Sequence, residues 1–258
     1  MEPKLRYFDI APSVTVFSTT RHGGVSKGLY GELNINPYCG DDDNAICQNR
    51  CALAHTLGIE ERHLIIPHQI HGTSIKIVDD DFLASSLKKQ CISIDGFDAV
   101  MTNCKGISTG VSTADCIPII LYDEIHHAAA AVHAGWRGTL QRIVGKVVEA
   151  MKEHYGTHPE LLKALIGPGI SLKNFEIGNE VFDAFKQAGF DMDRIAARYK
   201  KWHINLPECN HLQLLEAGVQ ADNIVDSAIC TYDNAADYFS ARRLGISSGR
   251  IYTGIVMR

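Results

Sequence analysis

The 258-residue sequence lacks long apolar runs. Its longest uninterrupted apolar stretches, residues 117–122 and 128–132, are the size of single strands. A helix that crosses a bilayer needs about 20 apolar residues, so we predict no membrane segment. No apolar segment of a secretory signal follows Met1, and the eight cysteines form no compact repeating framework. We therefore expect reduced thiols and a cytoplasmic protein.

Excess positive charge and internal divisions are also missing. The 25 Lys and Arg against 30 Asp and Glu give a net charge of −5, which argues against a broad nucleic-acid surface but permits a local basic pocket. The sequence has no internal repeat, low-complexity tract or Pro/Gly/Ser-rich linker. We predict one domain over residues 1–258, present as a monomer or small homo-oligomer.

Strand-like and helix-like segments interleave irregularly. Helical periodicity is strongest after residue 136, with Gly156 at the position of a C-terminal cap. The other helices are expected over residues 44–57, 180–188 and 207–218. Strands are expected at 14–20, 64–71, 74–78, 98–102, 106–112, 117–122, 128–133, 164–167, 202–206, 223–225 and 251–257. This order predicts a mixed α/β (α+β) fold, a mixed sheet flanked by helices.

The segment from residue 112 to 133 is the most informative. Two apolar strands flank a short polar turn, which is the pattern of an antiparallel hairpin. If the turn is centred between Glu124 and Ile125, Cys116 faces His133 with Cβ atoms roughly 5 Å apart. Such a pair is typical of two zinc ligands, of a nucleophile and its base, or of a buried thiol beside a histidine. The pair alone leaves all three open.

Two more histidines, His68 and His71, end a predicted strand. Because strand side chains alternate, they point to opposite faces, and Gln69 shares a face with His71. At most one of these histidines therefore joins Cys116 and His133.

Two glycine turns and one basic cluster are candidate anion sites. Residues 134–138 form a strand-to-helix turn in which Trp136 offers a flat face and Arg137 a charge. Residues 21–26 form a second turn, where backbone N–H groups beside Arg21 and Ser26 suit phosphate. An ordinary packed turn explains each motif equally well or better. The C-terminal arginines, residues 242, 243 and 250, are interpreted as a solvated face, with an anion site as the alternative.

Eight short strings of the sequence occur together in one known family. They are Arg21–Ser26, Gly40-Asp41 with Asn49-Arg50, Gln69–Gly72, Asp98–Thr102, Thr113–Pro118, His133–Gly138, Ile166–Ile170, and Ser240–Arg243 with Gly249-Arg250. In this order they resemble the YfiH-like laccase-domain family, whose members were first labelled polyphenol oxidases and are now described as purine nucleoside phosphorylases. Ala241 departs from the pattern, since an aromatic residue often stands there.

The resemblance implies that His71, Cys116 and His133 bind one metal ion, usually zinc, with copper (Cu²⁺) the less favoured choice. It also implies the mixed α/β fold described as CNF-toxin/YfiH-like and grouped with cysteine hydrolases. The implied reaction is cleavage of adenosine, inosine and S-methyl-5′-thioadenosine by phosphate, giving a free purine and a (methylthio)ribose 1-phosphate. Deamination of adenosine is the implied companion reaction.

The sequence can test the older oxidase label. A multicopper oxidase needs many histidines, generally in His-x-His pairs, and none of the 12 histidines forms one. One His₂Cys site cannot by itself deliver four electrons to dioxygen, so laccase chemistry is disfavoured. Two histidines and one cysteine match a catalytic zinc with an open position, which would activate water for deamination. The signature of the known zinc base deaminases is absent.

Phosphorolysis needs cations for phosphate and polar groups for the ribose and the departing base. We assign phosphate and substrate binding to Arg21, Ser26, Trp136 and Arg137, and catalytic contacts to Gln69, Asp115, Cys116 and Arg137. The expected partners are thus a purine nucleoside and phosphate, with no nucleic acid and no membrane. The alternatives are a Cys116/His133 hydrolase of amides or esters, such as a cell-wall precursor, a copper-dependent phenol oxidase, and a non-catalytic zinc-binding protein.

Overall fold

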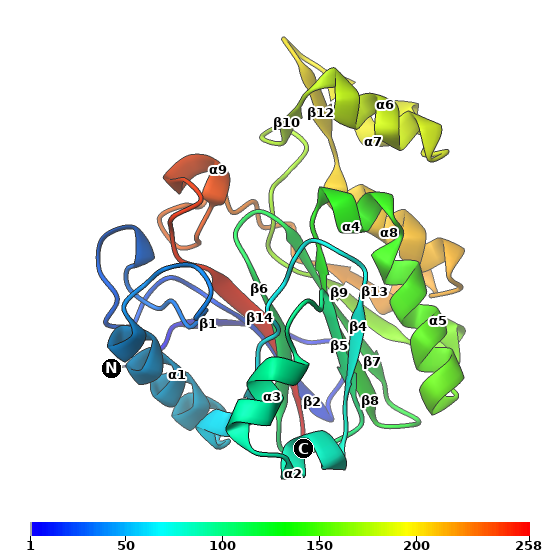
Figure 1. Cartoon of the computed structure of the whole chain (residues 1–258). Coiled ribbons are helices and arrows are strands. Elements are labelled where there is room, and N and C mark those ends of the chain that lie inside the picture. The colour runs from blue at the N-terminus through cyan, green and yellow to red at the C-terminus, as the bar shows by residue number, and fades with distance from the viewer. Residues whose placement is uncertain (1) are drawn as a thin grey trace.

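The structure is a computed structural model that describes residues 2–258. A six-stranded mixed sheet forms its centre (Figure 1). From one edge to the other, its strands are β13 (Ile224–Asp226), β9 (Lys163–Ile166), β7 (Ile117–Asp123), β8 (Ala128–Ala134), β5 (Ala99–Thr102) and β4 (Ile75–Val78). The outer pairs β9–β13 and β4–β5 are parallel, and the inner pairs are antiparallel.

A second, five-stranded sheet packs face to face on the first. Its order is β1 (Leu5–Phe8), β2 (Val14–Thr19), β14 (Ile251–Met257), β6 (Ser108–Thr113) and β3 (Leu64–Ile65). Ile120 and Tyr122 of β7 share a buried cluster with Val16, Val111 and Ile255 of the second sheet. Alternate side chains of β7 therefore face opposite layers, as the pleat requires.

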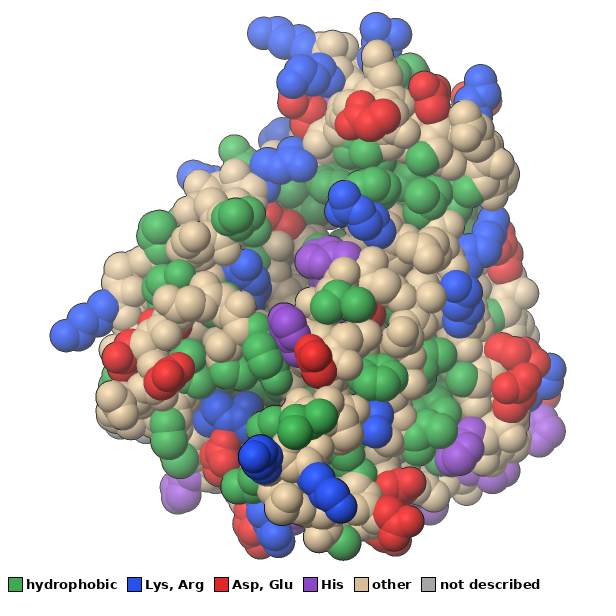
Figure 2. All heavy atoms as spheres, in the orientation of Figure 1, with side chains coloured by type: hydrophobic (Ala, Val, Ile, Leu, Met, Phe, Trp, Pro, Cys, Tyr) green, Lys and Arg blue, Asp and Glu red, His purple; other side chains and the backbone are tan. Residues whose placement is uncertain are grey.

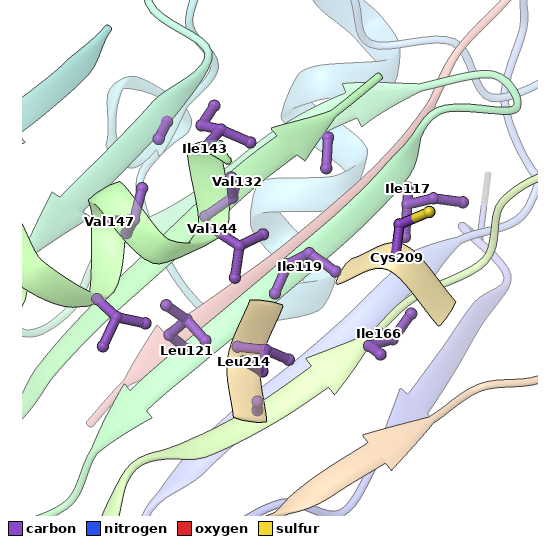
Figure 3. Packing of buried hydrophobic residues seen from close by; sticks show 14 of the residues in the cluster. Ile117, Ile119, Leu121, Val132, Ile143, Val144, Val147, Ile166, Cys209 and Leu214 are labelled. Carbon is purple, nitrogen blue, oxygen red and sulfur yellow. The ribbon is translucent and has the colours of Figure 1, made fainter. Parts of the chain in front are cut away.

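Helices cover the two outer faces of this pair of sheets. The helices α5 (Ile143–Tyr155) and α8 (Leu206–Glu216) pack on the central sheet, where Leu121 meets Val144 and Leu214 in the largest hydrophobic cluster (Figure 3). The helix α1 (Asp43–Leu57) packs on the second sheet, with Leu53 against Phe17. The molecule thus stacks helix, sheet, sheet and helix.

A small three-stranded unit projects from this body, at the top of Figure 1. It contains β10 (Glu176–Ile177), α6 (Asn179–Gln187), α7 (Met192–Ile195), β11 (Ala196–Arg198) and β12 (Trp202–Ile204). Short helices complete the fold: α2 (Asp80–Ala84), α3 (Leu87–Ser93), α4 (Trp136–Leu140) and α9 (Ala241–Leu244), with 3₁₀ turns at Gly28–Tyr30, Glu61–His63, Pro159–Leu161 and Ala221–Asn223. No helix within residues 2–258 has the length and apolar character to span a membrane.

The predicted mixed α/β fold with helices on its sheets is confirmed. The first long helix begins at Asp43, where the Asp42 side chain accepts from the N–H of Ala45, and it ends at a left-handed Gly58. The helix expected after residue 136 is divided into α4 and α5, because Arg142 adopts a φ of 60° between them. The predicted strand over 64–71 is wrong beyond Ile65, where the chain leaves the sheet.

Candidate functional site

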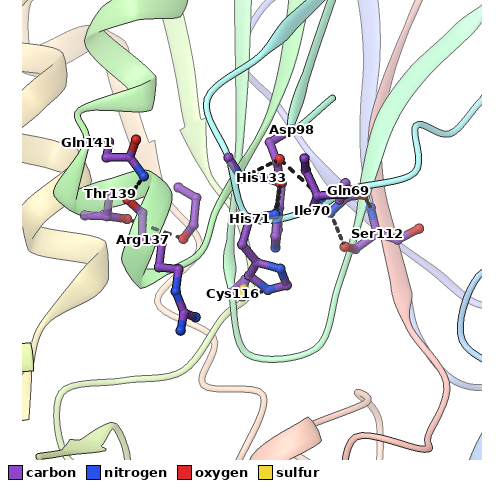
Figure 4. A network of polar contacts seen from close by, with 12 residues as sticks. Gln69, Ile70, His71, Asp98, Ser112, Cys116, His133, Arg137, Thr139 and Gln141 are labelled. Carbon is purple, nitrogen blue, oxygen red and sulfur yellow. Dashed lines mark hydrogen bonds and ion pairs between the residues drawn. The ribbon is translucent and has the colours of Figure 1, made fainter. Parts of the chain in front are cut away.

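Three side chains from distant segments converge at one end of the central sheet (Figure 4). His133 lies near the end of β8, Cys116 just before β7, and His71 in the loop that follows β3. Their ligand atoms all lie within 4.8 Å of one another, and the Cys116 Sγ is 3.9 Å from the His71 Nε2. The two imidazole rings meet edge to face at 4.8 Å. One thiolate and two imidazoles at this separation suit a zinc or copper ion.

The predicted hairpin register is wrong by two residues. Pro118, rather than Cys116, pairs with His133, and the loop comprises residues 124–127. The cause is Asp123, whose Oδ1 accepts from the N–H groups of Ile125 and His126 and so extends the ladder to its own position. Cys116 consequently lies just outside β7, and a bend in the chain rather than cross-strand pairing brings it to His133.

Asp115 makes that bend, with a φ of 84° in the left-handed region. It is buried, and both carboxylate oxygens are occupied: Oδ1 accepts from the Thr231 hydroxyl at 2.7 Å and Oδ2 from the Arg242 N–H at 2.7 Å. We predicted a contact between Asp115 and substrate. The observed bonds favour a role in holding the Cys116 loop.

Gln69 is also engaged with the protein. Its amide donates to the Ser112 carbonyl and accepts from the Ser112 N–H, both at 2.8 Å, so the side chain extends the edge of β6. The alternation argument for His68 and His71 does not apply, because no strand runs through them. His68 nevertheless stays outside the cluster and bonds to Asp95 at 2.6 Å.

One residue that we did not predict, Asp98, stands directly behind the three side chains. It is fully buried, and its Oδ1 lies 2.7 Å from the Nδ1 of His133. The N–H groups of residues 70–72 also donate to this carboxylate. The available signal was a carboxylate immediately before the strand β5, whose side chains are all buried.

The environment changes the pKa values of the Cys116 and His133 side chains. Burial raises the pKa of the Cys116 thiol, but the charge of His133 and hydrogen bonds to both imidazoles outweigh it and lower the pKa to about 6. Burial lowers the pKa of His133, but the negative charge of Cys116 and the bond to Asp98 raise it to about 9. Both shifts favour the same charge state in the metal-free protein, a thiolate on Cys116 beside an imidazolium on His133.

The triad opens into a cavity of about 420 Å³. Figure 2 shows this hollow near the centre of the molecule, with histidine and basic side chains around it. Its aromatic wall includes Tyr38, which stacks on His68 at 4.4 Å, and Phe175. Among the described residues that line it, Arg242 and Arg250 carry the permanent positive charges.

The guanidinium groups of these two arginines differ in how many hydrogen bonds hold them. Arg250 donates to the carbonyls of Ser248, Gly249 and Ile246, so its guanidinium is fixed. Arg242 makes one long bond of 3.5 Å and lies over the ring of Phe175. Arg242 is thus the cation best placed to receive an anion in the cavity. Arg242 is exposed, as the interpretation of a solvated face expects, and it also lines the cavity, which favours the alternative of an anion site.

The residues predicted to bind phosphate are placed differently. Arg21 donates to the carbonyls of Gly31 and Ala235, and Ser26 is buried against Asp41; neither lines the cavity. This argues against the predicted phosphate contacts of both. Trp136 packs on the core, and the exposed Arg137 lies 4.3 Å above its ring, beside Cys116 in Figure 4 but outside the cavity lining.

The chain matches known proteins along almost its entire length. A family model described as multi-copper polyphenol oxidoreductase laccase matches residues 15–258. A purine nucleoside phosphorylase of Bacteroides thetaiotaomicron is 42% identical, covering 95% of this chain and 92% of its own length. An adenosine deaminase, RL5, from an unknown prokaryotic organism is 40% identical, covering 98% and 97%. The crystal structure of YlmD from Geobacillus stearothermophilus has a TM-score of 0.90 at 28% identity, covering 97% and 94%.

Proposed function

The chain belongs to the family described as multi-copper polyphenol oxidoreductase laccase, and we propose that it is a zinc-dependent purine nucleoside phosphorylase. It is an enzyme that acts on purine nucleosides, in keeping with the names of the two relatives that are 42% and 40% identical. The proposed substrates are adenosine, inosine and S-methyl-5′-thioadenosine. Phosphate cleaves them to the purine and a (methylthio)ribose 1-phosphate, and deamination of adenosine is a second proposed activity.

The metal site is proposed to consist of His71, Cys116 and His133. Zinc fits this donor set, and a catalytic zinc has three protein ligands and one open position. No fourth His, Cys, Asp or Glu joins the cluster among residues 2–258, which disfavours a closed structural site. Copper also fits thiolate and imidazole, but a single such cluster does not supply the further coppers of a four-electron oxidase. When bound, zinc supplies a Lewis acid at the cavity wall.

The single observation that carries the proposal is that this cluster shares its cavity with Arg242, whose guanidinium makes only one long hydrogen bond. Phosphorolysis requires phosphate to be held beside the anomeric carbon while the purine departs. Arg242 is proposed to hold the phosphate, in place of Arg21 and Ser26. A volume of about 420 Å³ is within the usual range for small-molecule sites, roughly 300–1,000 Å³. The rings of Tyr38 and Phe175 offer flat faces for a base.

Phosphate dependence tests the reaction. Protein of measured metal content is incubated with inosine, with and without phosphate, and the hypoxanthine released is measured. We expect release with phosphate only. Release in both conditions would indicate a hydrolase, and no release in either would contradict the proposal.

The Arg242→Gln variant tests the phosphate site. Loss of a hydrogen bond to a charged group costs about 1.5–3 kcal/mol, so we expect the KM for phosphate to rise about 10- to 100-fold. Arg243→Gln is the matched control, because Arg243 is the next residue, is exposed, and donates to the Tyr232 carbonyl outside the cavity. Equal phosphate KM values for both variants would remove Arg242 from the site.

The ion pair of Cys116 and His133 favours a second candidate, a hydrolase of amides or esters. A thiolate beside an imidazolium is the activated form of a cysteine nucleophile. This candidate requires activity that survives removal of the metal by a chelator. The phosphorylase proposal requires the phosphate-dependent release of hypoxanthine to stop on chelation and to return with zinc.

A further inference from the structure

One buried carboxylate contacts both histidines of the cluster. The Asp98 Oδ1 lies 2.7 Å from the His133 Nδ1 and accepts from the His71 N–H at 2.9 Å. The Oδ2 accepts from the Gly72 N–H at 2.6 Å and from the Ile70 N–H at 3.3 Å. Four donors from two segments that are more than 60 residues apart therefore meet on one side chain.

We propose that Asp98 is the positioning residue of the metal site, and that it sets the placement of His71 and His133 together. This inference rests on the metal site of the proposed function. It adds a residue that touches neither metal nor substrate and acts through both histidine ligands.

The contact with His133 fixes which ring nitrogen is free. An imidazole that donates from Nδ1 to a carboxylate presents Nε2 to a metal, and such a carboxylate also fixes the ring orientation. Asp98 is the residue immediately before β5, and its backbone carbonyl accepts from the His133 N–H at 2.7 Å. Side chain and main chain thus hold the same histidine from one direction.

The contacts with residues 70–72 fix the other histidine through its backbone. His71 has a φ of 63°, in the left-handed region that is unfavourable for a residue with a Cβ. Three consecutive N–H groups that converge on a buried carboxylate can hold this conformation. Without them, the loop would be free to relax and to carry the His71 ring away from Cys116.

The test is the metal affinity of Asp98→Asn, measured with zinc and cobalt(II) by competition with a chelator. The asparagine has the same shape, but its NH₂ group donates and cannot accept. In either orientation of the amide, this group faces at least one loop N–H that the carboxylate accepts. We expect affinity to fall 10- to 100-fold, the usual effect of losing such a partner. The cobalt(II) absorption bands, which report the ligand geometry, should shift as well.

Asp95→Asn is the matched control. Asp95 lies in the same loop and bonds to the Nδ1 of His68 at 2.6 Å, but that histidine is not in the cluster. Its zinc affinity and cobalt spectrum should equal those of the wild type. If Asp98→Asn also equals the wild type in both measurements, the inference is overturned. If the wild type binds neither metal, the metal site of the proposed function itself is wrong.

Hydrogen exchange in the metal-free wild type tests the same contacts without a substitution, and decides the matter if Asp98→Asn does not fold. His71 is exposed and lies outside any strand, so its amide would ordinarily exchange quickly. Because Asp98 accepts the N–H groups of His71 and Gly72, we expect both to be protected, with exchange slowed at least 100-fold relative to an unstructured peptide. Exchange at the unstructured rate would overturn the inference.

Discussion

Gly135, the residue before α4, lies so close to His71 and Cys116 that a side chain there would crowd both. A Cβ at this position would be 3.0 Å from the His71 Cδ2 and 3.1 Å from the Cys116 Sγ. The backbone conformation, φ −68° and ψ 170°, is open to every residue type. Gly135→Ala therefore perturbs the triad by contact alone, without backbone strain.

The size of the effect follows from these distances. Carbon atoms pack at about 3.5–4.0 Å, so the new methyl group would displace the imidazole or the sulfur by roughly 0.5 Å. Functional constellations tolerate about 0.5 Å of error. We expect zinc affinity to fall about 10- to 100-fold, which corresponds to about 1.4–2.8 kcal/mol, with a parallel loss of turnover at limiting zinc.

Zinc affinity is measured by chelator competition and compared with the unfolding free energy of the metal-free protein. Gly135 caps α4, and alanine in place of a glycine cap costs at most about 1 kcal/mol. Gly145→Ala on α5 is the control, since nothing lies within 4 Å of its added Cβ. It should keep the wild-type affinity and gain up to about 1 kcal/mol of stability from helix propensity. Wild-type affinity in Gly135→Ala would refute the close approach of Gly135 to the ligands.

Two further predictions address charge and packing. In the metal-free protein, iodoacetamide should alkylate Cys116 at a rate that increases as pH rises through about 6, because the thiolate forms there rather than near the usual value of about 8.5; bound zinc should suppress the reaction, and a midpoint near 8.5 would contradict the ion pair. Leu121→Ala, in the fully buried cluster between β7 and its covering helices, should lower the unfolding free energy in urea by about 2–5 kcal/mol, whereas Leu161→Ala, 50% exposed, should change it by less than about 0.5 kcal/mol.

Local signals in the sequence were sufficient for most of the secondary structure. The caps of α1 and the glycine that ends α5 are visible because each depends on residues within one turn of the helix. The strands β7 and β8 are visible as apolar runs. The predicted hairpin register differs from the observed one by two residues because the Asp123 side chain bonds to the loop amides, and residue type alone does not show whether such a bond forms.

The same distinction applies to the candidate site, where local motifs are visible in the sequence and contacts between distant segments are not. The resemblance supplied His71, Cys116 and His133, and the structure brings these three together. The glycine turn at Arg21 looked like an anion site because sequence shows a cation and nearby N–H groups. It does not show that the guanidinium is already bonded to the carbonyl of Ala235, 214 positions away. An anion site at Arg242 was only the alternative to a solvated face, because the place of Arg242 in the cavity depends on the return of the chain after Tyr232.

Two buried aspartates give the site its shape. Asp98 holds the loop of one histidine and the ring of another, and Asp115 spans from the Cys116 bend to Thr231 and to the backbone of Arg242. Asp115 thus joins the loop of Cys116 to Arg242, the residue that we propose binds phosphate. Each buried carboxylate has its charge offset by donors from two segments, so the position of one segment is fixed relative to the other. The two histidines, the Cys116 bend and the backbone of Arg242 are therefore held in place by the protein itself.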